Sequence, residues 1–297
     1  MPTDMSPKTL RANIDDIVAV DPNRPAVYSP ASEPLSYRGL QSLLFQTIAY
    51  LEHSGVSTTD RVGVLLGQGA ENAMVCLSLM SAAICVPLNP GYTRSELGER
   101  FEQIGINGLI TDKHSCPQGI ALATQRDIPV HILEVDAGGL AGEFSLQPLQ
   151  APTVRSENRS DRVPVPLDST ALILQTSGST GRPKTVALSH RNLLVSTRNV
   201  VASLKLDAAD RCLNMLPLYH IGALLDLMLA PLSAGGSVIF GRDMRAQSFF
   251  EYLDAYSPTW YQAVPTMLHD IVLKCRRDQP AISDNSLRFC RSVSSPL

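Results

Sequence analysis

Hydroxyl residues, two glycines and a lysine are gathered in the stretch Thr176 to Lys184, which reads TSGSTGRPK. Glycines let the backbone approach a ligand closely, so that amide N–H groups can converge on an anion. The hydroxyl groups add donors, and the lysine adds a mobile positive charge. The residues expected to contact the anion are Thr176, Ser177, Gly178, Ser179, Thr180, Gly181 and Lys184. The stretch therefore predicts a phosphate-binding loop.

Hydrogen-bond strength is sufficient for this role. Charge-assisted hydrogen bonds contribute roughly 1.5–3 kcal/mol each, so three or four could hold a triphosphate without a deep pocket. Pro183 restricts the backbone before Lys184 and keeps Arg182 out of the helical region, which aims the lysine. The alternative is a solvated hairpin turn, in which Ser, Thr and Gly are also common. Because a lysine follows S-G-S-T-G between two strands that we expect to be buried, the phosphate interpretation is favoured.

Two familiar nucleotide loops do not match this stretch. In the Walker loop, G-x-x-x-x-G-K-[ST] leads into a helix, whereas Gly178 and Gly181 are closer together and the residues after Lys184 read as a strand. The dinucleotide pattern G-x-G-x-x-G is also absent. The sequence thus argues against kinase-like, GTPase-like and hydride-transfer functions.

The elements around the loop read as an α/β protein. Short apolar runs alternate with longer segments of helical period, which is typical of parallel-type sheets covered by helices on both faces. Strands are expected at 62–66, 84–88, 108–111, 130–135, 171–174, 185–188, 211–216 and 237–240. Helices are expected at 71–81, after a cap at Ser189, and at 224–230, where Pro231 and Gly235-Gly236 should end the helix.

A change of composition suggests two subdomains. From Asp136 to Asp168, glycines, prolines and scattered charges replace periodicity, as in a surface connection. We therefore predict a first α/β subdomain at 1–165 and a second, carrying the phosphate loop, at 166–297.

Composition limits the partners and the location. The chain has 297 residues, of which 44% are hydrophobic and 18% charged, and this predicts a soluble globular protein. A net charge of -3 and a pI near 6.1 provide no basic field, so nucleic acid is not an expected partner. No signal peptide is seen, and the longest apolar stretch, 73–88, is shorter than a bilayer crossing. We expect no membrane span and a cytoplasmic or peroxisomal location.

Several motifs together resemble one family. The stretch Thr176 to Lys184 resembles the signature loop of the adenylate-forming superfamily, which includes acyl-CoA synthetases, luciferases and adenylation domains of nonribosomal peptide synthetases. Further landmarks follow in the same order: LSYRGL (35–40), CVPLNPGY (85–92), LPLYHIGAL (216–224), LSAGGSVIF (232–240) and PTWYQAVPTMLHDIV (258–272). The likeness runs from about residue 15 to the end and is nearest to the oxalyl-CoA synthetase branch.

The resemblance implies a two-step reaction with ATP, Mg²⁺ and coenzyme A. A carboxylate attacks the α-phosphorus of MgATP to give an acyl-adenylate and pyrophosphate, and a thiol such as coenzyme A then displaces AMP. The loop from Thr176 to Lys184 would hold the β and γ phosphates, and the Thr180 hydroxyl would contact the metal. The expected partners are thus a carboxylic acid and a nucleotide.

The resemblance also implies a catalytic residue. His220 falls where the family places an aromatic or histidine contact near the carboxylate and the adenylate. A histidine that follows a strand end in a parallel sheet lies where ligands usually bind. The alternative is a histidine whose ring is satisfied by backbone groups.

The substrate pocket is expected near residue 260. The resemblance implies a pocket-lining helix at 258–272, and its candidate residues are Trp260, Tyr261, Val264, Pro265 and Thr266. The alternative is simple core, because apolar helices with Trp and Met are often core.

The end of the chain departs from the family pattern. The stretch CRSVSSPL (290–297) resembles a strand and turn that, in relatives, precede an adenine-binding loop and a small domain with a catalytic lysine. We expect an incomplete large domain that lacks the lysine-bearing domain and whose missing C-terminal part is a further partner. Three hypotheses stay open: part of an acyl-CoA synthetase, an adenylation module of a peptide-synthetase-like assembly, or a non-catalytic nucleotide-binding remnant.

Overall fold

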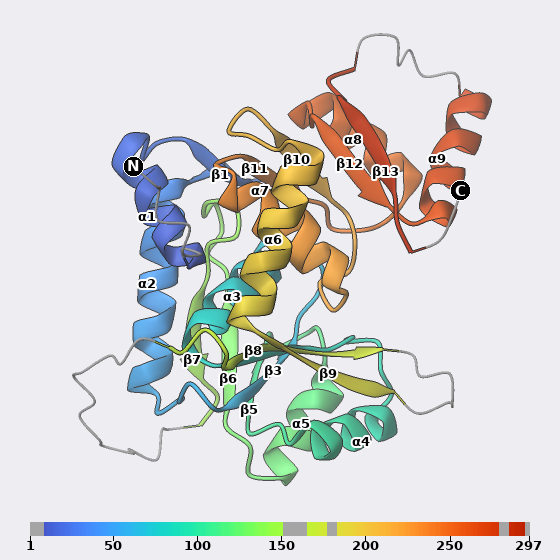
Figure 1. The fold of residues 1–297 in the computed structure, drawn as a ribbon. Helices are drawn as coiled ribbons and strands as arrows, with labels where there is room; N and C mark the ends of the chain where they lie inside the picture. Colours follow the sequence, from blue (N-terminus) through green and yellow to red (C-terminus); the bar gives the residue numbers. More distant parts are fainter. Residues whose placement is uncertain (1–8, 151–164, 177–182, 279–284, 295–297) are drawn as a thin grey trace.

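The protein folds into two β-sheets flanked by helices (Figure 1). The computed structural model describes residues 9–150, 165–176, 183–278 and 285–294. Most neighbouring strands in both sheets are parallel, and antiparallel strands occur only at sheet edges among the described residues. The predicted α/β class is therefore confirmed.

The larger sheet has seven strands in the order β7-β6-β5-β3-β4-β8-β9. Its strands are β3 (Arg61–Leu65), β4 (Ile84–Pro87), β5 (Gly108–Thr111), β6 (Val130–Glu134), β7 (Ser145–Pro148), β8 (Thr170–Thr176) and β9 (Lys184–Ser189). The five inner strands run parallel, whereas β7 and β9 pair antiparallel at the two edges. The inner strands are buried on both faces, which explains why they read as continuous apolar runs.

The second sheet has six strands in the order β13-β12-β10-β11-β1-β2. Its strands are β1 (Pro25–Tyr28), β2 (Leu35–Ser36), β10 (Arg211–Asn214), β11 (Ser237–Phe240), β12 (Trp260–Ala263) and β13 (Phe289–Ser292). All neighbours in this sheet are parallel except β1 and β2.

Helices connect and cover the strands. They are α1 (Leu10–Val20), α2 (Tyr37–His53), α3 (Ala70–Ala82), α4 (Arg94–Ile104), α5 (Pro117–Gln125), α6 (His190–Leu204), the π-helix η1 (Gly222–Leu229), α7 (Ala230–Ser233), α8 (Ala246–Tyr256) and α9 (Pro265–Asp278). The predicted cap of α6 is confirmed, because the Ser189 hydroxyl accepts a hydrogen bond from the Asn192 backbone N–H. None of the helices in the described ranges has the length and apolar character needed to cross a bilayer.

The two sheets interleave in sequence. Strands β8 and β9 follow residue 165 but belong to the seven-stranded sheet, and β1 and β2 precede it but belong to the six-stranded sheet. A boundary at residue 165 therefore does not separate the sheets. Strand β7 also lies within 136–168, where a surface connection without regular structure was expected, so that expectation was wrong for residues 145–148.

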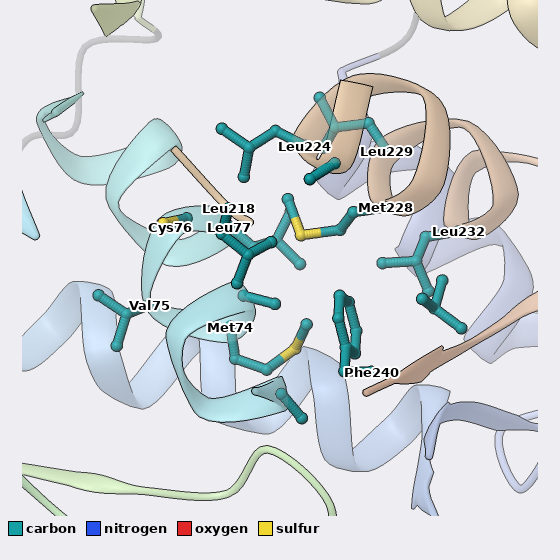
Figure 2. Close-up of a cluster of buried hydrophobic side chains, with 14 of the residues drawn as sticks. Met74, Val75, Cys76, Leu77, Leu218, Leu224, Met228, Leu229, Leu232 and Phe240 are labelled. Atoms are coloured by element: carbon teal, nitrogen blue, oxygen red, sulfur yellow. The ribbon is translucent and has the colours of Figure 1, made fainter. Parts of the chain in front are cut away.

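A shared core joins the two sheets. Nearly every residue of α3 is buried, because this helix packs against the seven-stranded sheet and against α2. Met74 and Leu77 of α3 lie opposite Met228 of η1 and Phe240 of β11 (Figure 2). A second cluster fills the other face of the seven-stranded sheet beneath α4 and α5.

Truncating a side chain at this junction should destabilise the fold. Leu77 is 1% exposed, and we expect Leu77→Ala to lower the free energy of unfolding by about 2–5 kcal/mol, since it leaves a cavity between the sheets. Leu273→Ala removes the same atoms from a side chain that is 47% exposed and serves as the control. Urea unfolding measures both variants, and equal losses would contradict the assigned core.

Candidate functional site

The hairpin β8–β9 positions the two ends of the predicted phosphate loop. Its strands pair antiparallel from Thr170 and Ser189 to Thr176 and Lys184, which lie opposite each other at the open end. Both end residues are exposed. The remaining predicted contacts lie outside the described residues: Ser177, Gly178, Ser179, Thr180 and Gly181. The hairpin thus fixes the base of the loop at a threonine hydroxyl and a lysine ammonium group.

The two strands of this hairpin differ in burial. Strand β8 has a buried central run, as expected. Strand β9, in contrast, is exposed from Lys184 to Ala187, so the expectation of two buried strands was wrong for β9. The physical reason is its place at the edge of the sheet, where it has a neighbouring strand on one side only.

A glutamine of α4 supports the base of the hairpin. The Gln103 Nε2 amide donates to the Pro183 carbonyl oxygen over 3.1 Å, directly before Lys184. The Gln175 Nε2 amide, directly before Thr176, lies 3.5 Å from Gln103 Oε1. One side chain therefore contacts both strands beside the loop. Gln103 could not be predicted from the sequence, because nothing in its own segment marks it.

His220 lies in a turn that leads into η1. Its N–H donates to the Pro217 carbonyl oxygen over 3.0 Å, and its own carbonyl accepts from the Ala223 N–H over 3.1 Å. The imidazole packs against the Tyr219 ring, with 4.7 Å between centroids, and the residue is exposed overall. Partial desolvation lowers the pKa of His220 from its usual value, which favours a neutral ring at pH 7. Within the described residues no hydrogen bond to the ring nitrogens is found, so backbone groups there do not satisfy them.

The carboxyl edges of the two sheets face one another. Strand β8 runs parallel to β4 and β3, so Thr176 lies at the same edge as the carboxyl end of β3. His220 follows the carboxyl end of β10 in the other sheet. The Gln68 Nε2 amide, just after β3, donates over 2.7 Å to the Met215 carbonyl oxygen, just after β10. The loop and the histidine therefore flank facing carboxyl edges, which is where α/β proteins bind ligands.

The predicted pocket residues do not share one helix. Trp260 and Tyr261 lie on β12 and are fully buried, whereas α9 begins only at Pro265, so a helix at 258–272 was wrong for 260–263. Adjacent strand residues point to opposite faces. Trp260 accordingly stacks on Phe289 of β13, with 5.5 Å between centroids, and Tyr261 contacts a phenylalanine of α8.

The start of α9 carries the other three candidates. Val264 and Pro265 are half-buried, and Thr266 is exposed. These residues follow the carboxyl end of β12, so they lie at the same edge of the six-stranded sheet as the turn that carries His220. Their role as a pocket wall stays a prediction.

A polar network beside these residues was missed. The Arg291 Nη1 atom donates to Asp226 Oδ2 over 3.1 Å and to Gln262 Oε1 over 2.8 Å. Gln262 Nε2 also donates to Asp226 Oδ2, over 3.0 Å. The available signal was an aspartate inside the otherwise apolar segment GALLDLML and a glutamine between two buried aromatic residues and an alanine.

Comparison with known proteins identifies the family. A profile of the family described as AMP-binding enzyme matches residues 14–297. Oxalate–CoA ligase of Arabidopsis thaliana is 30% identical over 298 residues, covering 99% of this chain and 57% of the relative. Sulfoacetate–CoA ligase of Cupriavidus necator is 30% identical, covering 97% and 55%. The crystal structure of apo MatB from Rhodopseudomonas palustris shares the fold, with a TM-score of 0.78, 24% identity and coverage of 97% and 55%.

The matches cover nearly all of this chain but only part of each relative. The chain spans little more than half the length of the curated relatives it matches. The family profile nevertheless covers nearly all of the chain, and it includes the hairpin, the turn at His220 and both sheets. The chain therefore belongs to the family of AMP-binding enzymes.

Proposed function

We propose that this chain carries the phosphate- and acid-binding part of an enzyme that activates a carboxylic acid with ATP and transfers it to a thiol. The single observation that carries the proposal is the loop at the open end of hairpin β8–β9, with Thr176 and Lys184 opposite each other at its base. An ammonium group, hydroxyl groups and glycine amides in this segment suit a polyphosphate.

In the first step, a carboxylate oxygen of the acid forms a bond to the α-phosphorus of ATP. The bond between that phosphorus and the oxygen bridging to the β-phosphorus breaks, and pyrophosphate leaves with the electron pair. The residues from Thr176 to Lys184 hold the β and γ phosphates and stabilise the charge of the departing pyrophosphate. Such reactions depend chiefly on positioning and charge stabilisation.

In the proposed reaction, Mg²⁺ binds together with the phosphates of ATP. No group of three His, Cys, Asp or Glu side chains in the described ranges could hold a metal ion. Mg²⁺ usually keeps several waters and is bound through substrate phosphates with few protein ligands, so the residues present are compatible with it. The Thr180 hydroxyl is the proposed protein contact, and the ion would neutralise phosphate charge.

His220 is proposed to orient the attacking carboxylate. A neutral imidazole, favoured by the lowered pKa of His220, can donate one N–H to a carboxylate oxygen. The start of α9, from Pro265 onward, is proposed to form the wall around the acid, with Trp260 behind it; Tyr261 points to the opposite face of β12 and is assigned to the core.

In the second step, a thiolate sulfur attacks the acyl carbon and AMP leaves. Relatives named oxalate–CoA ligase and sulfoacetate–CoA ligase support coenzyme A as the thiol and short polar acids as substrates. The sequence identity to a nonribosomal peptide synthetase of known structure is 20%, so this similarity concerns the fold alone. Coenzyme A is therefore preferred over a carrier-protein thiol.

Exchange of labelled pyrophosphate into ATP tests the proposal in the intact protein. We expect exchange that depends on both Mg²⁺ and a carboxylic acid, because only the reversible adenylation step links pyrophosphate to ATP. Exchange without any acid, or none across a panel of short and aromatic acids, would contradict the proposed function.

A further inference from the structure

Three neighbouring parallel strands each place a polar side chain on the same face of the six-stranded sheet. These residues are Asn214 of β10, Gln262 of β12 and Arg291 of β13, and the register pairs Gln262 with Arg291. Asp226 of η1 accepts hydrogen bonds from Gln262 and Arg291. We call these four residues the polar row.

Hydrogen bonds join the polar row to the overlying helix. Besides the bonds among Asp226, Gln262 and Arg291, the Asn214 Nδ2 amide donates to the Ala223 carbonyl oxygen over 2.9 Å. The helix is a π-helix, a rare conformation that is frequent at functional sites. The polar row therefore lies directly under η1, which begins two residues after His220.

The surroundings of the polar row are apolar. On the same face, the preceding residues of β12 and β13 are Trp260 and Phe289, whose rings stack. Gln262 is fully buried, and the side chains of Asp226 and Arg291 are 18% and 38% exposed. Removing an ion pair from water is costly, and apolar residues of similar volume often stabilise a core as well or better. Packing alone therefore does not account for these residue types.

Some hydrogen-bond donors of the polar row are not used within the row. In the described part of the chain, Arg291 donates only through Nη1, which leaves the edge formed by Nε and Nη2 for another acceptor. Asp226 already accepts two hydrogen bonds at Oδ2. A Cβ atom at Gly222 would lie 3.4 Å from Gln262 Nε2, so the glycine leaves that amide without a side-chain neighbour from position 222.

We propose that the polar row recognises a second oxyanion on the acid substrate, and this inference rests on the proposed function. The free edge of the Arg291 guanidinium would bind a carboxylate or sulfonate through two parallel hydrogen bonds, while Asp226 and Gln262 hold the guanidinium in place. Guanidinium groups favour such two-point binding. The first carboxylate would then lie toward His220, and apolar acids would leave the arginine without its acceptor.

Direct binding to the intact protein without ATP tests this inference. Malonate and 3-methylbutanoate are nearly isosteric and differ by the second carboxylate. Equilibrium dialysis with labelled acids should show malonate bound at least about tenfold more tightly, the effect of one charge-assisted contact. Quenching of Trp260, the single tryptophan, gives a second readout beside the polar row.

Variants assign the preference to Arg291. Arg291→Gln should remove the preference for malonate, and Arg291→Lys, which keeps the charge but not the planar edge, should keep only part of it. Asp226→Asn should keep or strengthen malonate binding, because it removes a competing negative charge. Arg288→Gln is the matched control: it breaks another arginine–aspartate pair of the same segment, 2.7 Å from Asp210, and should keep the preference.

Three outcomes would overturn the inference: equal binding of the two acids, no malonate binding, or an unchanged preference in folded Arg291→Gln. Thermal unfolding verifies the fold of each variant. ATP binding is measured separately on the same samples. If ATP binds and malonate is not preferred, this inference fails and the proposed function stands; if malonate is preferred and ATP does not bind, the proposed function fails instead.

Discussion

Replacing Lys184 and Ser177 together by alanine should weaken ATP binding to the intact protein by a factor of about a hundred or more. The double change removes two polar contacts to the phosphates, each worth about 1.5–3 kcal/mol, and the lost free energy of about 3–6 kcal/mol corresponds to this factor. Lys184 is exposed at the base of the loop, so its loss should leave the fold intact. Calorimetric titration with MgATP measures the affinity, and pyrophosphate exchange measures the adenylation rate.

A lysine elsewhere provides the control for this experiment. Lys113→Ala also removes an exposed ammonium group, but its Nζ atom pairs with Glu134 over 2.9 Å, away from the hairpin. This variant should bind ATP as the unaltered protein does. Unchanged ATP affinity in the folded double variant would refute the phosphate role of the loop.

Replacing His220 by alanine should lower the adenylation rate about 10- to 100-fold. The variant removes the N–H donor proposed to orient the carboxylate, and one such charge-assisted contact is worth about 1.5–3 kcal/mol. His220→Gln retains an N–H donor and should recover part of the rate. Because the phosphates bind elsewhere, ATP affinity should change little in both variants. Acid-dependent pyrophosphate exchange at saturating ATP measures the rate.

His269→Ala separates this effect from a general loss of histidine. His269 is an exposed residue of α9, and its replacement should leave exchange unchanged. If His220→Ala exchanged pyrophosphate at the rate of the unaltered protein, the assigned role would be wrong.

Strand locations followed well from the sequence, whereas strand neighbours did not. The strand at 108–111 was predicted to the residue, because all four residues of β5 are buried and none of them is charged. In contrast, β1 pairs with β11, which is about two hundred residues away in sequence. Local apolar patterns carry no information about such pairing, so the interleaving of the two sheets could not be predicted.

The helical segment after His220 shows that the end and the type of a helix were not fully predictable from the sequence. The sequence predicted a helix at 224–230 ended by Pro231 and Gly235-Gly236. Helix α7 continues through Pro231, so the proline was wrong as a stop, whereas the helical segment does end just before the glycine pair. Pro231 lies in the first turn of α7, where a missing N–H costs little, and the chain turns only at Gly235, which has a φ of 80°. Helix η1 packs against α6 and β10, and the spacing of leucines does not encode these contacts or the π-helical geometry.

Part of the candidate site could be predicted from the sequence, and part could not. The motif from Thr176 to Lys184 could be identified from the amino-acid sequence, because its proposed role depends on consecutive residues. The polar row could not, because Asp226, Gln262 and Arg291 come from three separate segments and meet only when β12, β13 and η1 pack together. Contacts between distant segments require the fold.

A crystal structure of the intact protein with a non-hydrolysable ATP analogue tests the central claim most directly. The account predicts β and γ phosphate oxygens within hydrogen-bond distance of Lys184 Nζ and of the backbone amides between Thr176 and Lys184. An analogue whose phosphates lie elsewhere, with this segment packed against the protein and no space for an anion, would contradict it.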